Sequence, residues 1–284
     1  MPTAVLAGVR AGDGHPVRLV AALNVSPESF YPGSVRLDPG ALRDAVQQAV
    51  ADGADFIDIG AMSTAPYLRG EVAPDEELRR VTRALAAVAG TVSVPLSVDT
   101  QRAAVAAAAL DAGASIVNDV SGLGADPGMA AVAARAGGLI AAVAHTGPID
   151  VSPPAFVRKL LAASLRRAEE AGIDLTRVVL DPGIGFFTHT GIAPEQFSCT
   201  VLDHLRTLLD LGRPLLIGVS RKSFIGKVTG RREPAERLFG SLAAAAIAVY
   251  NGAALVRTHD VAATRDAVRI GEAIRDASTA GRAG

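Results

Sequence analysis

One stretch of the sequence, residues 95–122, restricts the possible folds more than any other. Two short runs rich in Val and Ile, 96–98 and 116–120, have the length and composition of buried strands. Between them, residues 101–112 are rich in alanine and are followed by Gly113, a common residue just after a helix. A strand, a helix and a strand in so short a stretch predict a right-handed parallel crossover.

Each of these two strands ends in polar side chains that a buried strand has no packing reason to carry. Asp99 and Thr100 close the first strand, and Asn118 and Asp119 close the second. The carboxyl ends of neighbouring parallel strands lie at one edge of a sheet, where α/β proteins bind their ligands. The sequence therefore predicts a carboxylate and an amide side by side at a ligand site.

The alternation of strand and helix continues along most of the chain. Eight apolar runs of strand length recur, separated by helical segments: 18–25, 55–60, 96–99, 116–120, 138–144, 177–180, 214–219 and 254–256. This pattern predicts an α/β fold, a single (β/α)8 TIM barrel. A chain of 284 residues with 49% hydrophobic content can bury one large core. We expect one domain over residues 1–284, with the barrel core at about 18–274.

Charge and hydropathy argue against two classes of partner. The chain carries 28 basic and 29 acidic residues, a net charge of -1, so no general field attracts nucleic acid or an anionic membrane. The longest apolar stretch, residues 242–250, is far shorter than the ~20 residues that cross a bilayer. We therefore expect small-molecule substrates, with no nucleic-acid and no membrane partner.

Cysteine and histidine usage also limits the chemistry. The single Cys199 cannot form an internal disulfide, and we expect it to pack within a helix. The five histidines are scattered and predict no zinc or iron site. Residues 1–20 lack the charged start and apolar run of a secretory signal, so a cytoplasmic protein is expected.

Four strand-end residues predict recognition of a flat heterocycle. Asp99, Asn118, Asp181 and Lys222 would line the floor of the barrel mouth. Two carboxylates, an amide and an ammonium match a planar, nitrogen-rich ring that has donor and acceptor edges. The alternative for any single Asp or Asn is a helix cap. Capping explains one of these residues more readily than all four together.

The last two strands predict an anion site. Ser220 and Arg221 follow the seventh strand, and Arg257 and His259 stand two residues apart on the eighth, so their side chains share one face. Asn24 ends the first strand, which adjoins the eighth in a closed barrel. A diphosphate with Mg²⁺ would fit between them. The alternatives are a surface ion pair for Arg257 and a structural role for His259.

Seven segments, in order along the chain, resemble the signatures of the dihydropteroate synthase family of pterin-binding barrels. They are LNVSPESF at Leu23, GADFIDIGAMSTAP at Gly53, SVDT at Ser97, IVNDVSG at Ile116, LDPGIGF at Leu180, IGVSRKSFIG at Ile217 and VRTHDV at Val256. The resemblance covers almost the whole predicted barrel. It implies a transferase of folate biosynthesis that joins 6-(hydroxymethyl)-7,8-dihydropterin diphosphate to an arylamine and releases diphosphate, and it suggests a homodimer.

The resemblance also implies roles for individual residues. Asp99, Asp181 and Lys222 would be catalytic residues at the pterin ring, which Asn118 also holds. Ser220 would lie near the arylamine, and Thr64 and Arg221 would also contact substrate. Arg257 and His259 would bind the diphosphate, and Asn24 would bind its Mg²⁺.

The sequence keeps the family's pterin-ring residues but departs from the family pattern on the anion and arylamine side. Ala65 stands where members usually carry Arg, and 187–189 stand where they usually carry Gly-Lys. Ala144 replaces a methionine, and Arg69 could supply the missing guanidinium. We expect the pterin substrate to be retained, with an acceptor other than plain p-aminobenzoate, such as a methanopterin-type arylamine that bears a ribosyl phosphate. The alternatives are a methyltetrahydrofolate-dependent corrinoid methyltransferase and a non-catalytic pterin-binding homologue.

Overall fold

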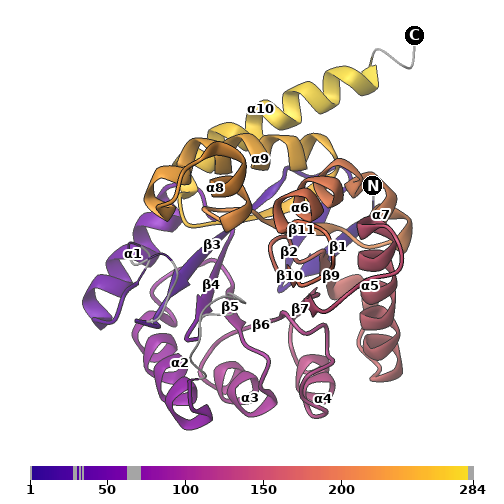
Figure 1. Cartoon of the computed structure of the whole chain (residues 1–284). Coiled ribbons are helices and arrows are strands. Elements are labelled where there is room, and N and C mark those ends of the chain that lie inside the picture. Colours follow the sequence, from indigo (N-terminus) through magenta and orange to yellow (C-terminus); the bar gives the residue numbers. More distant parts are fainter. Residues whose placement is uncertain (1, 28–30, 32, 34, 63–71, 281–284) are drawn as a thin grey trace.

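Eight parallel strands close into a barrel that helices surround (Figure 1). The computed structural model describes residues 2–27, 31, 33, 35–62 and 72–280. Around the barrel the strand order is β11-β12-β3-β4-β5-β6-β7-β9. The strands are β3 (Arg18–Asn24), β4 (Phe56–Gly60), β5 (Leu96–Asp99), β6 (Ile116–Asp119), β7 (Gly138–Ala142), β9 (Val178–Asp181), β11 (Leu215–Gly218) and β12 (Ala253–Thr258). The predicted (β/α)8 barrel is confirmed.

Helices cover the outside of the barrel. They are α1 (Pro39–Ala51), α2 (Pro74–Val88), α3 (Ala103–Asp111), α4 (Met129–Ala134), α5 (Pro153–Glu170), α6 (Pro194–Asp203), α7 (Leu205–Leu208), α8 (Ser223–Thr229), α9 (Leu238–Tyr250) and α10 (Val261–Ala280). Short 3-10 turns are η2 (Leu175–Arg177), η3 (Leu209–Leu211) and η4 (Pro234–Arg237). Within the described residues, no helix has both the length and the apolar character that a bilayer-spanning segment requires.

Successive side chains along each strand point to opposite faces of the barrel wall, and this alternation creates two apolar cores. In β4, Ile57 and Ile59 point outward and pack with the helices, whereas Phe56 points inward. Ile116, Val179 and Leu255 point inward from other strands and join Phe56 in the interior cluster. Both faces of each strand are therefore buried, which explains why the strands are almost continuously apolar. Two residues farther along, the inward positions become polar.

A hairpin that the sequence did not predict closes the amino-terminal end of the barrel. Strands β1 (Thr3–Leu6) and β2 (Val9–Gly12) pair in antiparallel fashion, and Leu6 is fully buried in the interior cluster. The Ala7 amide donates to the Gly137 carbonyl, at 2.9 Å, just before β7. The packed unit therefore begins near residue 3, well before the expected core start at about 18.

A second small sheet links two loops at the carboxyl end. Strand β8 (His145–Thr146) pairs in parallel with β10 (Phe187–Thr188), and β7 ends at Ala142, earlier than predicted. The ring of Phe187 is buried and stacks on Phe197 with 4.4 Å between centroids. The departure at residues 187–189 thus has a structural consequence, because Phe187 packs into the core.

The prediction for Cys199 is wrong. This residue lies on α6, where Phe197, Ser198, Val201 and Leu202 face inward, and its own side chain is exposed. Position 199 lies between the two buried pairs, so the helical period turns it toward solvent.

Candidate functional site

Three neighbouring strands supply a connected set of polar side chains at the mouth. Asp58, Asp99 and Asn118 lie at or past the middle of β4, β5 and β6, toward the carboxyl ends, and all three are buried. Asp99 and Asn118 are paired in the strand register. The Asn118 amide Nδ2 donates to Asp58 Oδ2 at 3.0 Å. The predicted carboxylate and amide therefore lie side by side, and Asp58 joins them.

Arg257 joins this set from β12, which β3 separates from β4 in the barrel. Its Nε donates to Asp58 Oδ2 at 2.6 Å, and its Nη2 donates to Asp99 Oδ2 at 3.0 Å. Burial would lower the pKa of Arg257, but the charges of Asp58 and Asp99 outweigh burial and raise it. The ion pair is thus internal, with two carboxylates, instead of the surface pair considered from sequence.

Two carboxylate oxygens of this set are buried without a hydrogen-bond partner among the described residues, Asp58 Oδ1 and Asp99 Oδ1. Buried acceptors are normally satisfied, so orphaned ones mark places where a ligand N–H can donate. Burial raises the pKa of Asp99 to about 7, while Arg257 acts in the opposite direction. The mouth therefore offers two unused acceptors, and the charge of Asp99 responds to pH near neutrality.

Asp181 and Lys222 complete the four predicted floor residues. Asp181 ends β9, and its Oδ1 accepts from the Gly183 amide at 2.8 Å. Lys222 Nζ donates to the Ile184 carbonyl and lies 4.2 Å from the Phe186 ring centroid. Burial raises the pKa of Asp181, partly offset by Lys222. Burial lowers the pKa of Lys222 to about 8, partly offset by Asp181.

Electrostatic contacts show that the four floor residues share one region. Arg257 and Asp58 both interact with Asp99 and with Asp181, and Lys222 interacts with both of those carboxylates. The structure therefore brings Asp99, Asn118, Asp181 and Lys222 together, through Asp58 and Arg257.

Glycine permits the loop after β9 to fold over the mouth. Gly183 has φ +68°, and a Cβ there would lie 1.7 Å from the Val143 carbonyl oxygen. Gly185 has φ +83°, and a Cβ there would press on the Lys222 stem at 3.1 Å. Only glycine fits both positions, so this loop can present the Ile184 carbonyl to Lys222.

Ser220 and His259 form a second polar pair, between β11 and β12. Ser220 Oγ accepts from the His259 backbone amide at 3.2 Å and lies 2.9 Å from its Nδ1. Either atom can be the donor of this bond; when the hydroxyl donates to Nδ1, the hydrogen of the neutral ring is on Nε2. Burial, with help from Arg257 and Arg221, lowers the pKa of His259 to about 3. His259 is thus a neutral imidazole at pH 7.

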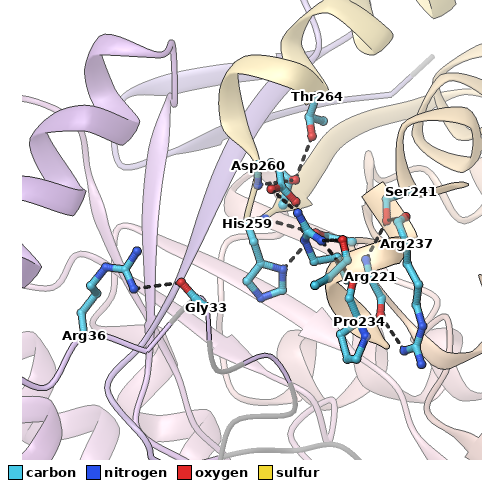
Figure 2. Close-up of polar contacts among 12 residues, drawn as sticks. Gly33, Arg36, Arg221, Pro234, Arg237, Ser241, His259, Asp260 and Thr264 are labelled. Carbon is cyan, nitrogen blue, oxygen red and sulfur yellow. Dashed lines mark hydrogen bonds and ion pairs between the residues drawn. The ribbon is translucent and has the colours of Figure 1, made fainter. Parts of the chain in front are cut away.

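Arg221 is buried in a network that protein groups fill (Figure 2). Its Nε and Nη2 donate to both oxygens of Asp260, at 2.8 and 2.7 Å. Its Nη1 donates to the carbonyls of Pro234 and Ala235, at 3.0 and 2.8 Å, and the Tyr31 ring covers it at 4.5 Å. The guanidinium expected to contact substrate therefore ties η4 and the start of α10 to the site.

The backbone of Arg221 is held as firmly as its side chain. Its φ is +55°, a left-handed value that is uncommon outside glycine. Its amide donates to Ser241 Oγ at 2.8 Å, and its carbonyl accepts from Arg237 Nη1 at 3.0 Å. This clamp, part of which Figure 2 shows, fixes the peptide between Ser220 and Lys222 and so directs both side chains.

Asn24 ends β3 beside the carboxylates. A Cβ added to Gly60 would lie 3.6 Å from Asn24 Oδ1 and 3.7 Å from Asp99 Oδ2, so both oxygens border the same glycine. The described residues contain no group of three or more His, Cys, Asp or Glu side chains placed to hold a metal. A single amide oxygen suits Mg²⁺ that takes its remaining ligands from substrate phosphate and water.

Some predictions lie outside the described residues, and some site residues were missed. Thr64, Ala65 and Arg69 belong to the undescribed segment 63–71. Asp58 was not predicted as a site residue, although, like Asp99, it is a carboxylate near the carboxyl end of a buried strand. Tyr31 contacts both Arg221 and, edge-on at 5.5 Å, His259, and no sequence pattern pointed to it.

Comparisons with known proteins agree with this geometry. Residues 20–259 match the profile of a family described as "Pterin binding enzyme". The chain is 37% identical to the dihydropteroate synthase of Synechocystis sp. over 276 residues, 90% of this chain and 89% of that protein. It is 38% identical over 263 residues to the inactive dihydropteroate synthase 2 of Mycobacterium tuberculosis, 87% of this chain and 79% of that one.

A solved structure is also similar over nearly the whole chain. Dihydropteroate synthase from Xanthomonas albilineans, in complex with 7,8-dihydropteroate, superposes with a TM-score of 0.81 at 35% sequence identity. The match covers 97% of this chain and 99% of that one.

Proposed function

This chain belongs to the pterin-binding enzyme family, among the dihydropteroate synthases, and from that premise we propose how its mouth works. It acts as a transferase that joins 6-(hydroxymethyl)-7,8-dihydropterin diphosphate to an arylamine and releases diphosphate. The observation that carries this proposal is the buried group of Asp58, Asp99, Asn118, Asp181 and Lys222, in which two carboxylate oxygens await donors.

The carboxylates would bind the pterin ring and stabilise its activated form. Asp99 and Asp58 accept from ring N–H groups, while Lys222 donates to ring acceptors. The C–O bond at the 6-methylene carbon breaks with its electron pair leaving on diphosphate, and the ring delocalises the positive charge left behind. Buried carboxylates stabilise that charge. The amine lone pair forms the new C–N bond, the amine then passes its proton to solvent, and no covalent enzyme intermediate is required.

The opposite side of the mouth would hold the leaving anion. Nε and Nη2 of Arg257 are engaged by carboxylates, which leaves Nη1 for a phosphate oxygen. His259 donates from Nε2 as a neutral ring, held by Ser220. Asn24 would hold Mg²⁺ together with diphosphate oxygens, and the bound ion would neutralise charge on the leaving group. The positive charge that develops on the ring would thus face carboxylates, and the negative charge on the diphosphate would face Arg257, His259 and Mg²⁺.

The acceptor is proposed to differ from unmodified p-aminobenzoate. The support is the set of departures in the loops around the mouth. Where family members usually carry Gly-Lys, this chain has Phe187, and its side chain is packed into the core. Ala144, between β7 and β8, is small and exposed. An arylamine that bears a ribosyl phosphate is the modified acceptor to test first.

A non-catalytic pterin-binding role is the second candidate function. The observation that favours it is the match to an inactive dihydropteroate synthase 2 at an identity similar to that of the Synechocystis enzyme. Methyl transfer to a corrinoid protein gains no such support, because it has no use for the paired Ser220 and His259 at the anion end.

Diphosphate release tests these alternatives. Purified protein is incubated with the pterin diphosphate, Mg²⁺ and either p-aminobenzoate or the ribosyl phosphate derivative, with amine-free and Mg²⁺-free controls. We expect amine-dependent and Mg²⁺-dependent release, faster with the modified amine. Equal turnover with plain p-aminobenzoate would contradict the altered acceptor. Ring binding by calorimetry without release under any amine would instead favour the non-catalytic role.

We also propose that two copies of the chain associate. Helices α9 and α10 pack side by side (Figure 1) and carry large apolar side chains that face solvent: Phe239 is 81% exposed, and Ile247, Ile270 and Ile274 are each more than half exposed. Patches of this kind mark protein contacts. Sedimentation analysis should give a dimer, and a monomer at all concentrations would overturn this proposal.

A further inference from the structure

Helix α2 carries a fully buried carboxylate that belongs to none of the groups described above. Glu77 is 0% exposed, although it stands in a helix turn with the exposed Asp75 and the half-buried Glu76. Burying a carboxylate is costly unless both oxygens are satisfied. Glu77 Oε1 accepts from the Thr100 hydroxyl at 2.6 Å, and Oε2 accepts from Arg102 Nη1. Both partners lie on one short segment.

That segment is the turn that follows Asp99. Thr100 Oγ1, while donating to Glu77, also accepts from the Arg102 amide at 3.2 Å. The Thr100 amide donates to the Asn118 carbonyl at 3.0 Å, which links the turn to the next strand. Glu77 therefore anchors the turn from outside the barrel while Asn118 anchors it from within the sheet.

The direction of Asp99 depends on this turn. Its side chain has one bonded oxygen, Oδ2 with Arg257 at 3.0 Å, and its Oδ1 has no partner among the described residues. One hydrogen bond leaves part of the side chain's orientation to the backbone that carries Asp99, because that backbone sets the direction of the Cα–Cβ bond. The residue that follows Asp99 is Thr100, and its side chain is held by Glu77.

We propose that Glu77 is a positioning residue for the pterin subsite, which holds Thr100 and Arg102 so that Asp99 Oδ1 faces the ring. This inference rests on the proposed function, because it concerns how that site is built. Glu77 touches no substrate itself. It acts through the turn, and it connects helix α2 to Asp99, the carboxylate that we propose binds the ring.

Electrostatics supply a second readout. The charged groups around Asp99 are Arg257 of β12, Asp58 of β4, Glu77 of α2 and Asp119 of β6, with Lys222 beyond β11. Burial is the main cause of the raised pKa of Asp99; Arg257 lowers this pKa, and the three carboxylates raise it further. Loss of the Glu77 charge would therefore lower the pKa of Asp99, and ring binding that needs ionised Asp99 would persist to lower pH.

The test is calorimetric titration of Glu77→Gln with 6-(hydroxymethyl)-7,8-dihydropterin between pH 5.5 and 8.5. At pH 8, where Asp99 is mostly ionised, the dissociation constant should rise about fivefold, because the turn loses its charged anchor. The pH at which affinity declines should shift downward. A residue that only stabilises the fold would leave the affinity at pH 8 unchanged, so the affinity at pH 8 is the deciding readout.

Asp55→Asn is the matched control. Asp55 likewise binds one arginine and one neutral donor, Arg18 Nη1 at 3.0 Å and the Leu19 amide at 2.9 Å, but at the amino-terminal end of the barrel. It should lower the melting temperature as Glu77→Gln does and leave the affinity for the ring within about twofold of wild type.

Thr100→Val and Thr100→Ser keep the inference testable if Glu77→Gln does not fold. Valine removes the hydroxyl but keeps the shape, and should weaken ring binding. Serine keeps the hydroxyl, and should restore most of the affinity. If wild type binds the ring and both Glu77→Gln and Thr100→Val bind it equally well at pH 8, the positioning role is wrong and the proposed function stands. If wild type does not bind the ring, the proposed function itself fails.

Discussion

The two ends of the barrel are built from the same strands but from opposite kinds of side chain. In β4, Phe56 and Asp58 point inward two residues apart, and in β9 the same is true of Val179 and Asp181. The first member of each pair packs in the apolar interior cluster beneath the hairpin. The second lies at the mouth as a buried carboxylate. Two residues along the strand thus separate the stabilising layer from the layer that we propose binds the ligand.

This contrast shows how the fold supports an unfavourable site. The lower layer gains free energy from apolar burial, whereas the upper layer buries charges and includes two carboxylate oxygens that have no partner in the described part of the chain. Such a site is maintained for function at the expense of stability. Substitutions at the two ends should therefore separate stability from activity.

The largest effect is expected at the apolar end. Leu6→Ala removes a fully buried side chain that packs on Gly138, where an added Cβ would meet Leu6 Cδ2 at 2.6 Å. The free energy of unfolding should fall by about 3 kcal/mol, measured by urea denaturation. Turnover per folded molecule should be unchanged, because no mouth residue moves.

Val5→Ala is the matched control in the same hairpin. Val5 is 38% exposed, so its truncation should cost less than about 1 kcal/mol. A loss of activity in Leu6→Ala without a loss of stability would show that the two ends are not separable in this way.

The next largest effect is expected on kcat/KM, from a substitution at the mouth. Lys222→Met removes the ammonium that the loop after β9 holds over the site, and kcat/KM should fall about 100-fold, close to 2.7 kcal/mol. Burial lowers the pKa of Lys222 to about 8, so the folded state disfavours its charge, and methionine should not lower the melting temperature.

Lys227→Met provides the comparison on α8, the helix that Lys222 directly precedes. Lys227 lies on α8 with an exposed side chain, and its replacement should leave turnover within about twofold of wild type. Equal losses for the two lysine variants would remove Lys222 from the site.

The sequence predicted the layer architecture well because the relevant signals are local. Apolar runs at regular intervals are visible without the fold, and so are the polar residues that close them. The hairpin was missed because its strands have four residues each and lack a long apolar run. Their stability comes from the barrel interior, which only the closed fold creates.

The site residues that escaped prediction depend on partners distant in sequence. Glu77 belongs to an acidic first turn, and only Thr100 and Arg102, 23 and 25 residues away, distinguish it from its exposed neighbour Asp75. Arg221 and Arg257 are both strand-end arginines. Their partners, Asp260 in one case and Asp58 with Asp99 in the other, decide which one is part of the framework and which one reaches the mouth.

The most direct measurement of the central claim is calorimetric binding of 6-(hydroxymethyl)-7,8-dihydropterin to wild type and to Asp181→Asn at pH 8. Asparagine replaces an acceptor-only carboxylate by a group that also donates, against the N–H edge of the ring. The account predicts one ring bound per chain and about a tenfold loss of affinity in the variant. An affinity for the ring that is the same in both proteins would contradict it.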